Sequence, residues 1–292
     1  MELYSPQVIK YIKDKYGFKI SKSLGQNFLT NKDVIDSIIE SADIGPSDLV
    51  IEIGPGLGVL TKEAAELAGK VIAIEIDENL IPILKENLQE YDNIEYVNQD
   101  VLKTDITSLV EANKEIDGNP CTGVKILGNL PYYITTPIIM KILEDGVPAD
   151  SITIMMQKEV ADRIKSGPGT KAYGALSVAV QYYCDVVDIC YVSRGNFYPA
   201  PNVDSYVLRL DILKEHPVQL ESEAIFFATV KGSFGQRRKT LSNSLTGVCG
   251  ITKDQAFQAL EAAGIDPVRR GETLSLEEFA ALAKEVGKFA EK

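Results

Sequence analysis

The residues with the clearest potential for chemistry are Asn129, Leu130, Pro131 and Tyr132, which follow the apolar run 124–128. An amino group on a planar base is a weak nucleophile because its lone pair is delocalised, so its methylation depends on close positioning. The side-chain oxygen of Asn129 and the carbonyl of Leu130, held rigid by Pro131, could accept both amine hydrogens and stabilise the developing positive charge. Tyr132 offers a stacking face for an extruded base. The tetrad therefore predicts methyl transfer to a base; a plain turn after a strand is the structural alternative.

A second aromatic candidate lies in the segment Phe197-Tyr198-Pro199-Ala200-Pro201. Phe197 could cover the opposite face of a base that is stacked on Tyr132. Packing of this ring in the hydrophobic core is an equally good interpretation.

A glycine motif, Glu-Ile-Gly-Pro-Gly-Leu-Gly, occupies residues 52–58. Glycine lets a ligand approach the backbone closely where a strand turns into a helix. A dinucleotide-binding fingerprint would require glycine at position 59, where this chain has Val59. The spacing of Gly54, Gly56 and Gly58 instead suits a nucleoside with a short charged tail, as in S-adenosylmethionine.

Acidic residues follow the next two predicted strands. Glu75 lies seventeen residues after Gly58, where a carboxylate can accept both ribose hydroxyls of a nucleoside. Asp100 follows the third strand and can accept a hydrogen bond from the adenine amino group. Helix capping is the structural alternative, and the placement of acids at successive strand ends favours the cofactor.

Several classes of protein are disfavoured by composition. His216 is the only histidine of the 292 residues, which leaves little room for a Ser-His triad, a histidine base or a zinc site. The four cysteines form no Cys-x-x-Cys pair, as is typical of reduced thiols in a cytoplasmic protein. No apolar run approaches the length of a membrane span, and we expect no secretory signal. Catalysis by positioning and polarisation, without a metal, is expected.

The formal net charge of −12 argues against a nucleic-acid partner, because phosphate contacts need lysine and arginine. Its distribution reverses this interpretation: residues 1–32 sum to +4, whereas residues 33–157 sum to −16. Residues 231–239 contain four basic residues and no acid. The candidate RNA contacts are Lys22, Arg237, Arg238 and Lys239, with a solvated charged face as the alternative.

Short β-branched runs alternate with amphipathic stretches from about residue 48, which predicts an α/β doubly wound parallel sheet. The predicted strands are 48–53, 70–76, 94–98, 124–128 and 151–156, the predicted helices 59–68, 78–90 and 134–144, and the closing antiparallel edge pair 186–192 and 203–210. After residue 212 only helices are predicted, at 221–233, 239–245, 253–263 and 275–286. We therefore expect two domains, 1–212 and 213–292.

Taken together, these residues resemble the ribosomal RNA small-subunit adenine dimethyltransferases over nearly the whole chain. The matching segments are Leu24–Leu29, Glu52–Gly58, Asn129–Tyr132, Gln157–Ala161, Phe197–Ser205, Gln236–Leu241 and Arg270–Ser275. Related enzymes acting on 23S rRNA are shorter and basic and carry isoleucine between the asparagine and the proline. Leu130, the length and the acidic balance favour the small-subunit enzyme.

This resemblance implies a Rossmann-like class I S-adenosylmethionine-dependent methyltransferase that converts two adjacent adenosines near the 3′ end of 16S rRNA to N6,N6-dimethyladenosine. It implies a monomer whose N-terminal segment covers the cofactor and whose helical domain docks on the pre-assembled small subunit. The implied cofactor contacts are Gln26, Asn27, Leu29, Gly54, Gly56, Glu75, Ile76, Asp100, Val101 and Asn129. A DNA adenine methyltransferase and a ribosome-assembly factor that acts as a checkpoint are the alternatives.

Overall fold

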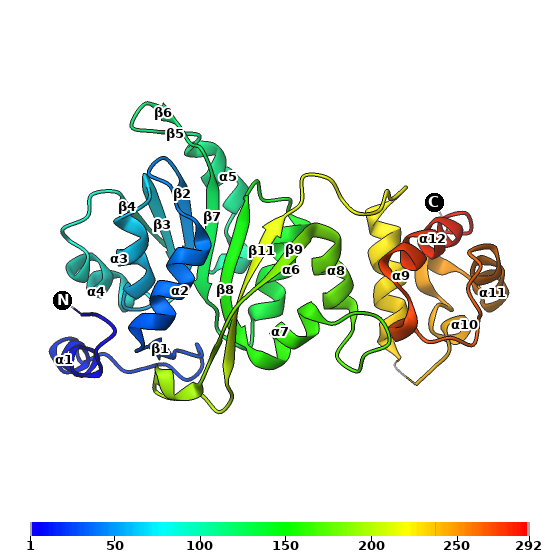
Figure 1. The fold of residues 1–292 in the computed structure, drawn as a ribbon, viewed down its shortest axis with the longest axis horizontal. Coiled ribbons are helices and arrows are strands. Elements are labelled where there is room, and N and C mark those ends of the chain that lie inside the picture. Colours follow the sequence, from blue (N-terminus) through cyan, green and yellow to red (C-terminus); the bar gives the residue numbers. More distant parts are fainter. Residues whose placement is uncertain (1, 237, 291–292) are drawn as a thin grey trace. The chain divides into compact units, whose positions relative to one another are not determined.

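The computed structural model describes residues 2–236 and 238–290. Contacts divide the chain into two compact units, each seen in Figure 1. The sheet unit contains the residues up to Ala161 together with Val186–Ile212, and the helical unit contains Asp162–Asp185 and the residues from Leu213. The segment Asp162–Asp185 therefore differs from its expected place in the first domain.

The physical reason lies in helix α8 (Ala175–Tyr183), which buries its aromatic and aliphatic side chains within the helical unit. The ring of Tyr182 lies 5.5 Å from that of Phe226 in helix α9 (Glu223–Gly235), and the Tyr182 hydroxyl donates to Glu223 at 2.9 Å. Periodicity alone does not show which neighbour such a helix will select.

A seven-stranded sheet forms the centre of the sheet unit. Its order is β4 (Ile94–Asn98), β3 (Lys70–Glu75), β2 (Leu49–Ile53), β7 (Val124–Asn129), β8 (Ser151–Gln157), β11 (Ser205–Ile212) and β9 (Cys184–Val192). The first five strands are parallel, and β11 runs antiparallel to β8. The predicted doubly wound sheet with a closing edge pair is confirmed (Figure 1).

The strand order reverses beside β2. From this strand the chain moves outward to β3 and β4, and then returns to place β7 on the other side of β2. Loops that follow such neighbouring strands diverge and leave a crevice at the carboxyl ends of the strands. The sequence places the glycine motif after β2 and the Asn129 tetrad at the end of β7, so both face this crevice.

Helices cover the sheet because its central strands are apolar on both faces, as all five residues of β2 are buried. The helices of the sheet unit are α1 (Pro6–Tyr16), α2 (Lys32–Ala42), α3 (Val59–Ala65), α4 (Leu80–Asn87), α5 (Ile106–Ala112) and α6 (Thr135–Glu144), while α7 (Lys158–Lys165) crosses into the helical unit. Two short ladders, β1 (Phe28–Leu29) with β10 (Phe197–Tyr198) and β5 (Glu115–Ile116) with β6 (Asn119–Pro120), complete the strands.

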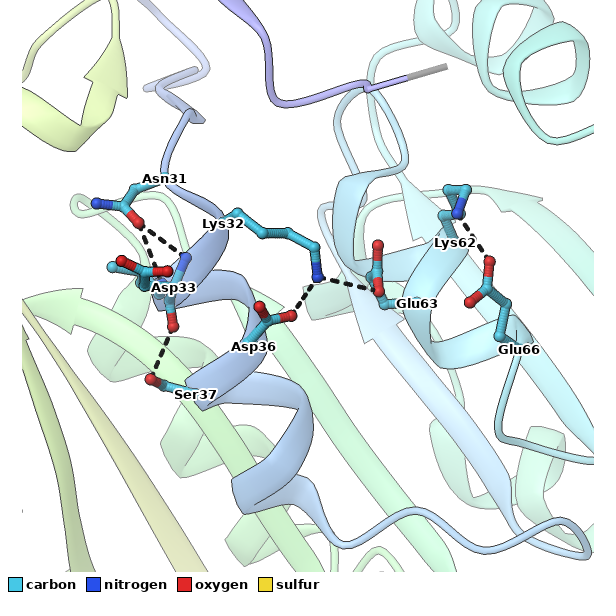
Figure 2. A network of polar contacts seen from close by, with 9 residues as sticks. Asn31, Lys32, Asp33, Asp36, Ser37, Lys62, Glu63 and Glu66 are labelled. Carbon is cyan, nitrogen blue, oxygen red and sulfur yellow. Dashed lines mark hydrogen bonds and ion pairs between the residues drawn. The ribbon is translucent and has the colours of Figure 1, made fainter.

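Helix α2 is fixed at its first turn by a polar network (Figure 2). The side-chain oxygen of Asn31 caps the helix by accepting from the amide of Asp33 at 2.9 Å, and Lys32 joins Asp36 of the same helix to Glu63 of α3. Asn31 also donates to the side chain of Asn196 at 3.0 Å. These contacts hold the chain that precedes α2, including β1, in one position.

The helical unit also contains α10 (Leu241–Ser244), α11 (Lys253–Ala262) and α12 (Leu276–Gly287). A capping box begins α12: Glu278 donates its amide to the Ser275 hydroxyl at 3.2 Å, and the Ser275 amide donates to the Glu278 carboxylate at 2.9 Å. The buried side chain of Phe279 packs in the first turn that this box closes.

Replacing Ser275 with alanine removes the oxygen that accepts the Glu278 amide. We expect Ser275→Ala to lower the free energy of unfolding by about 1 kcal/mol. Urea unfolding followed by circular dichroism measures the change. Gln258→Ala, at an exposed position of α11, is the control and should change this free energy by less than about 0.5 kcal/mol. Equal losses in both variants would contradict a role for the cap.

Candidate active site

One cavity lies at the carboxyl ends of β2, β3 and β7 and holds about 1020 Å³ of empty space, the open mouth included. Its lining includes all ten predicted cofactor residues, namely Gln26, Asn27, Leu29, Gly54, Gly56, Glu75, Ile76, Asp100, Val101 and Asn129. Leu130, Pro131 and Tyr132 line the same cavity. The structure therefore brings the glycine motif and the tetrad together around a single space.

The glycine motif is shaped by left-handed backbone conformations, with φ of +70° at Gly54, +60° at Gly56 and +89° at Gly58. Other L residues rarely adopt such angles. A Cβ atom on Gly56 would lie 3.1 Å from the ring of Phe28, whereas on Gly54 it would meet only the Asn129 carbonyl, at 4.0 Å. The loop is thus closely covered at Gly56 and open at Gly54.

Glu75 is held rigidly at the end of β3. Its side chain is 5% exposed, and its two oxygens accept from the amides of Asp77 at 2.9 Å and Gly56 at 3.3 Å. Burial raises the pKa of this carboxyl, and the two amides oppose that shift. A carboxylate fixed in this way retains acceptor capacity on both oxygens, which fits the two ribose hydroxyls of a nucleoside.

Glu52 is a buried carboxyl in the cavity wall to which the sequence analysis assigned no role. Its Oε2 atom has no hydrogen-bond partner among the described residues. Burial raises the pKa of Glu52 to about 8; the neighbouring Thr61 hydroxyl lowers it, and the Glu75 carboxylate adds to the rise. An unpartnered buried carboxyl is energetically unfavourable and fits a cationic ligand group, such as the ammonium of an amino-acid tail.

Asp100 caps a helix, which is the structural alternative to cofactor binding that the sequence left open. Its Oδ1 atom accepts from the amide of Leu102 at 3.0 Å and caps the short helix Val101–Lys103. Asp100 also lines the cavity beside Ile76, which is 49% exposed. Capping and ligand binding are therefore compatible at this position.

The segment before α2 is tied to the cavity through the side chain of Gln26 and the backbone carbonyl of Asn27. Gln26 donates to the carboxylate of Asp77 at 2.7 Å and accepts from the amide of Ser21 at 2.7 Å. The carbonyl of Asn27 accepts from the Asn129 side chain at 2.9 Å. Asp77 is only 7% exposed, and sequence reasoning missed it. Its place two residues after Glu75, at the same strand end, was the available signal.

The tetrad begins where β7 ends. The side-chain nitrogen of Asn129 donates to the Asn27 carbonyl. The side-chain oxygen, Oδ1, takes no part in this hydrogen bond. The Leu130 amide donates to the carbonyl of Met155 at 3.1 Å, and the carbonyl of Pro131 accepts from the Ile134 amide at 3.1 Å. Within the described residues, no recorded hydrogen bond occupies Oδ1 of Asn129 or the carbonyl of Leu130. Two acceptors thus remain for a ligand.

Tyr132 is anchored through its hydroxyl, which lies 2.6 Å from the hydroxyl of Ser205 at the start of β11. Burial raises the pKa of this phenol, and the Ser205 contact partly offsets the rise. The tyrosine therefore stays neutral near pH 7, and its ring is fixed at the cavity wall.

Phe197, the second aromatic candidate, lies in the hydrophobic core and not beside the tetrad in the cavity wall. It is 5% exposed and pairs with Leu29 across the β1–β10 ladder, in the core that contains Leu127 and Met155. It is not among the residues that line the described cavity. Of the two interpretations, core packing describes its position.

The candidate RNA contacts lie outside this cavity. Lys22 is exposed, and its carbonyl accepts from the amide of Gly25 at 3.1 Å in a turn that leads to the cavity lining. Arg238 and Lys239 are exposed residues of the helical unit, and Arg237 lies outside the described residues. The described residues place no three metal-binding side chains together, and none of the described helices is long and apolar enough for a membrane span.

The model of the family described as ribosomal RNA adenine dimethylase matches residues 17–288. Two curated relatives are each named ribosomal RNA small subunit methyltransferase A. The relative from Alkaliphilus metalliredigens is 53% identical over 286 residues, which cover 98% of each chain. The relative from Clostridioides difficile is 54% identical over 281 residues, which cover 96% of each chain. A crystal structure of a dimethyladenosine transferase from Plasmodium falciparum matches with a TM-score of 0.74 and 27% identity, over 89% of this chain and 97% of that one. The 23S rRNA methyltransferase ErmE matches with a TM-score of 0.65 and 27% identity, over 89% of this chain and 100% of that one. The chain belongs to the ribosomal RNA adenine dimethylase family.

Proposed function

We propose that this protein transfers methyl groups from S-adenosylmethionine to N6 of two adjacent adenosines near the 3′ end of 16S rRNA, within the small ribosomal subunit. The observation that carries this proposal is the single cavity in which Glu75 and the two free acceptors of Asn129 and Leu130 meet. The names of the curated relatives support the small-subunit RNA as substrate.

The nucleoside part of the cofactor is assigned to Glu75, Ile76, Asp100 and Val101. Its amino-acid end is assigned to Gly54, Gly56 and Glu52, with Gln26, Asn27 and Leu29 as the covering segment. When bound, S-adenosylmethionine supplies a methyl group activated by a sulfonium. The fit rests on the open face of Gly54 and on the unpartnered carboxyl of Glu52.

The tetrad polarises the base without a catalytic histidine. Because the Asn129 nitrogen is committed to Asn27, the oxygen is the atom that accepts from the adenine amino group, together with the Leu130 carbonyl. These two acceptors favour a pyramidal nitrogen and stabilise its positive charge as the bond from nitrogen to the methyl carbon forms. The bond from that carbon to sulfur breaks in the same step, and its electron pair would remain on sulfur as a neutral thioether. The methylated nitrogen then releases one proton to solvent, and Tyr132 holds the base by stacking.

The wider assignments belong to the same proposal. The protein acts as a monomer in the cytoplasm, and the exposed Arg238 and Lys239, together with Arg237 and with Lys22 of the N-terminal segment, contact rRNA phosphates. Docking by these residues also supports a checkpoint role in small-subunit assembly. A DNA adenine methyltransferase is disfavoured, because the family is defined by ribosomal RNA.

The direct test combines the protein with labelled S-adenosylmethionine and unmethylated small subunits, followed by mapping of the modified nucleotides. Two adjacent dimethylated adenosines near the 3′ end of 16S rRNA are expected. Modification of 23S rRNA, or of DNA in place of rRNA, would overturn the proposal.

Asn129→Ala removes one acceptor of the adenine amino group. We expect the single-turnover rate of methylation to fall at least about 100-fold, the usual effect of losing one oriented transition-state partner. Calorimetry with S-adenosylhomocysteine should show a smaller effect, a dissociation constant raised by no more than about 10-fold, because only the neutral hydrogen bond to Asn27 is lost. Asn119→Ala, in the exposed β5–β6 hairpin, is the matched control. An unchanged rate in Asn129→Ala would refute the polarisation mechanism.

Glu75→Ala removes the carboxylate assigned to the ribose. We expect cofactor affinity to fall about 10- to 100-fold, because hydrogen bonds to a charged acceptor contribute about 1.5–3 kcal/mol. The exposed Glu78 provides the control Glu78→Ala. Sedimentation with small subunits should show that Glu75→Ala still binds them, which separates docking from catalysis. Loss of subunit binding in Glu75→Ala would instead refute a docking function that is separate from cofactor binding and catalysis.

Glu52 makes cofactor binding dependent on pH. With a pKa of about 8, its carboxyl is mostly protonated at pH 7, and pairing with an ammonium favours the ionised form. Binding of S-adenosylhomocysteine should therefore release protons, up to about one at neutral pH, and the affinity should rise between about pH 6 and 7.5. Calorimetry in buffers of different ionisation enthalpy counts these protons. The same release from Glu52→Gln would show that another group is responsible.

A further inference from the structure

Two exposed apolar side chains of the described residues line the cavity, Ile76 and Tyr133. Ile76 follows Glu75 and is assigned to the cofactor. Tyr133 is 57% exposed although it directly follows the tetrad, and it has no part in the proposed methyl transfer. Aromatic side chains are common in the lining of ligand pockets, and Tyr133 supplies an exposed one to this cavity.

The ring of Tyr133 is supported from one side. A Cβ atom placed on Gly25 would lie 3.4 Å from Cδ1 and 3.5 Å from Cε1 of this ring, and 3.5 Å from the side chain of Pro131. The α-carbon of Gly25 therefore faces the ring, and the space between them would hold no more than a methyl group. Because this contact leaves more than half of Tyr133 exposed, the ring retains an accessible surface.

The turn that carries Tyr133 is also rigid. The Ile134 amide donates to the Pro131 carbonyl at 3.1 Å, and the Thr135 hydroxyl donates to the same carbonyl at 3.0 Å. Tyr132, the preceding residue, is fixed by Ser205. Two consecutive tyrosines thus project from one constrained turn, the first partly buried and anchored at the wall, the second exposed at the mouth.

The proposed substrate contains a base that needs such a surface. When one adenosine leaves its stack to enter the cavity, the adjacent nucleotide loses a stacking partner, which costs a few kcal/mol. Stacking of a base on an aromatic side chain contributes about 1–3 kcal/mol and tolerates any base. Tyr133 lines the same cavity as Tyr132 and is more exposed, so a nucleotide next to an extruded adenosine could reach its ring.

We propose that Tyr133 binds substrate RNA by stacking on the nucleotide next to the adenosine being methylated. This assignment rests on the proposed methylation of two adjacent adenosines. It gives each adenosine a role in positioning the other, since each is the neighbour when the other occupies the cavity.

The first test measures methylation of unmethylated small subunits by Tyr133→Ala and Tyr133→Phe. Tyr133→Ala should raise KM about 5- to 150-fold, whereas Tyr133→Phe, which keeps the ring, should stay within about 3-fold of the wild type. The dissociation constant of S-adenosylhomocysteine should be unchanged in both variants. Leu67→Ala, which truncates another exposed apolar side chain of the sheet unit, is the control.

The second test replaces one of the two adenosines by uridine, which stacks more weakly, and follows methylation of the other. Wild-type KM should rise on this replacement, and Tyr133→Ala should respond several-fold less, because the stacking contact is already absent. Equal responses in both proteins would overturn the proposal. So would an unchanged KM in Tyr133→Ala, or a loss confined to cofactor binding.

Failure of the wider functional proposal is distinguishable. If the wild type does not methylate adjacent adenosines in the small subunit, the proposed function fails before any variant is compared. If the wild type does so and Tyr133→Ala behaves like it, only the stacking assignment is lost.

Discussion

The reversal of strand order beside β2 is the constraint on which the rest of the sheet unit depends. Since β3 and β7 flank the same central strand, the loops that leave β2 and β7 diverge and leave a crevice between them. The packing here allows little variation: a Cβ on Gly128 of β7 would lie 3.0 Å from the carbonyl of Ile53 and 2.7 Å from the side chain of Leu130. Close contact between two strand ends therefore positions both motifs.

In the proposed mechanism, one hydrogen bond connects enclosure of the cofactor with the orientation of the side chain that contacts the adenine amino group. The Asn129 amide donates to the carbonyl of Asn27 in the covering segment, and this commitment leaves the amide oxygen as the acceptor. The same segment is joined to the end of β3 through Gln26 and Asp77. Three chain segments that are distant in sequence thus meet around the site, and each orients a polar group of another.

Much of this arrangement could be predicted because it leaves local signals. Alternating apolar runs predict the parallel strands, and the glycine spacing, Glu75 and the tetrad mark three strand ends that topology then brings together. Contacts without such a signal were missed or left open. The aromatic ring of Phe197 is of a type that could stack on a base. Only the pairing of Phe197 with Leu29 in the folded structure shows that the ring is packed in the core. No helix was predicted within Asp162–Asp185, and this segment has no local mark of the unit with which it packs. The burial that raises the pKa of Glu52 arises only from the folded cavity.

The clamp between Asn31 and Asn196 has a consequence for biosynthesis. These residues are 165 positions apart, and the β1–β10 ladder beside them requires Phe197 and Tyr198. The covering segment is made first, yet its partners emerge only after two thirds of the chain has been translated. Contacts of such high sequence separation also form slowly. The covering segment, although it is synthesised early, is therefore expected to be among the last parts of the sheet unit to fold.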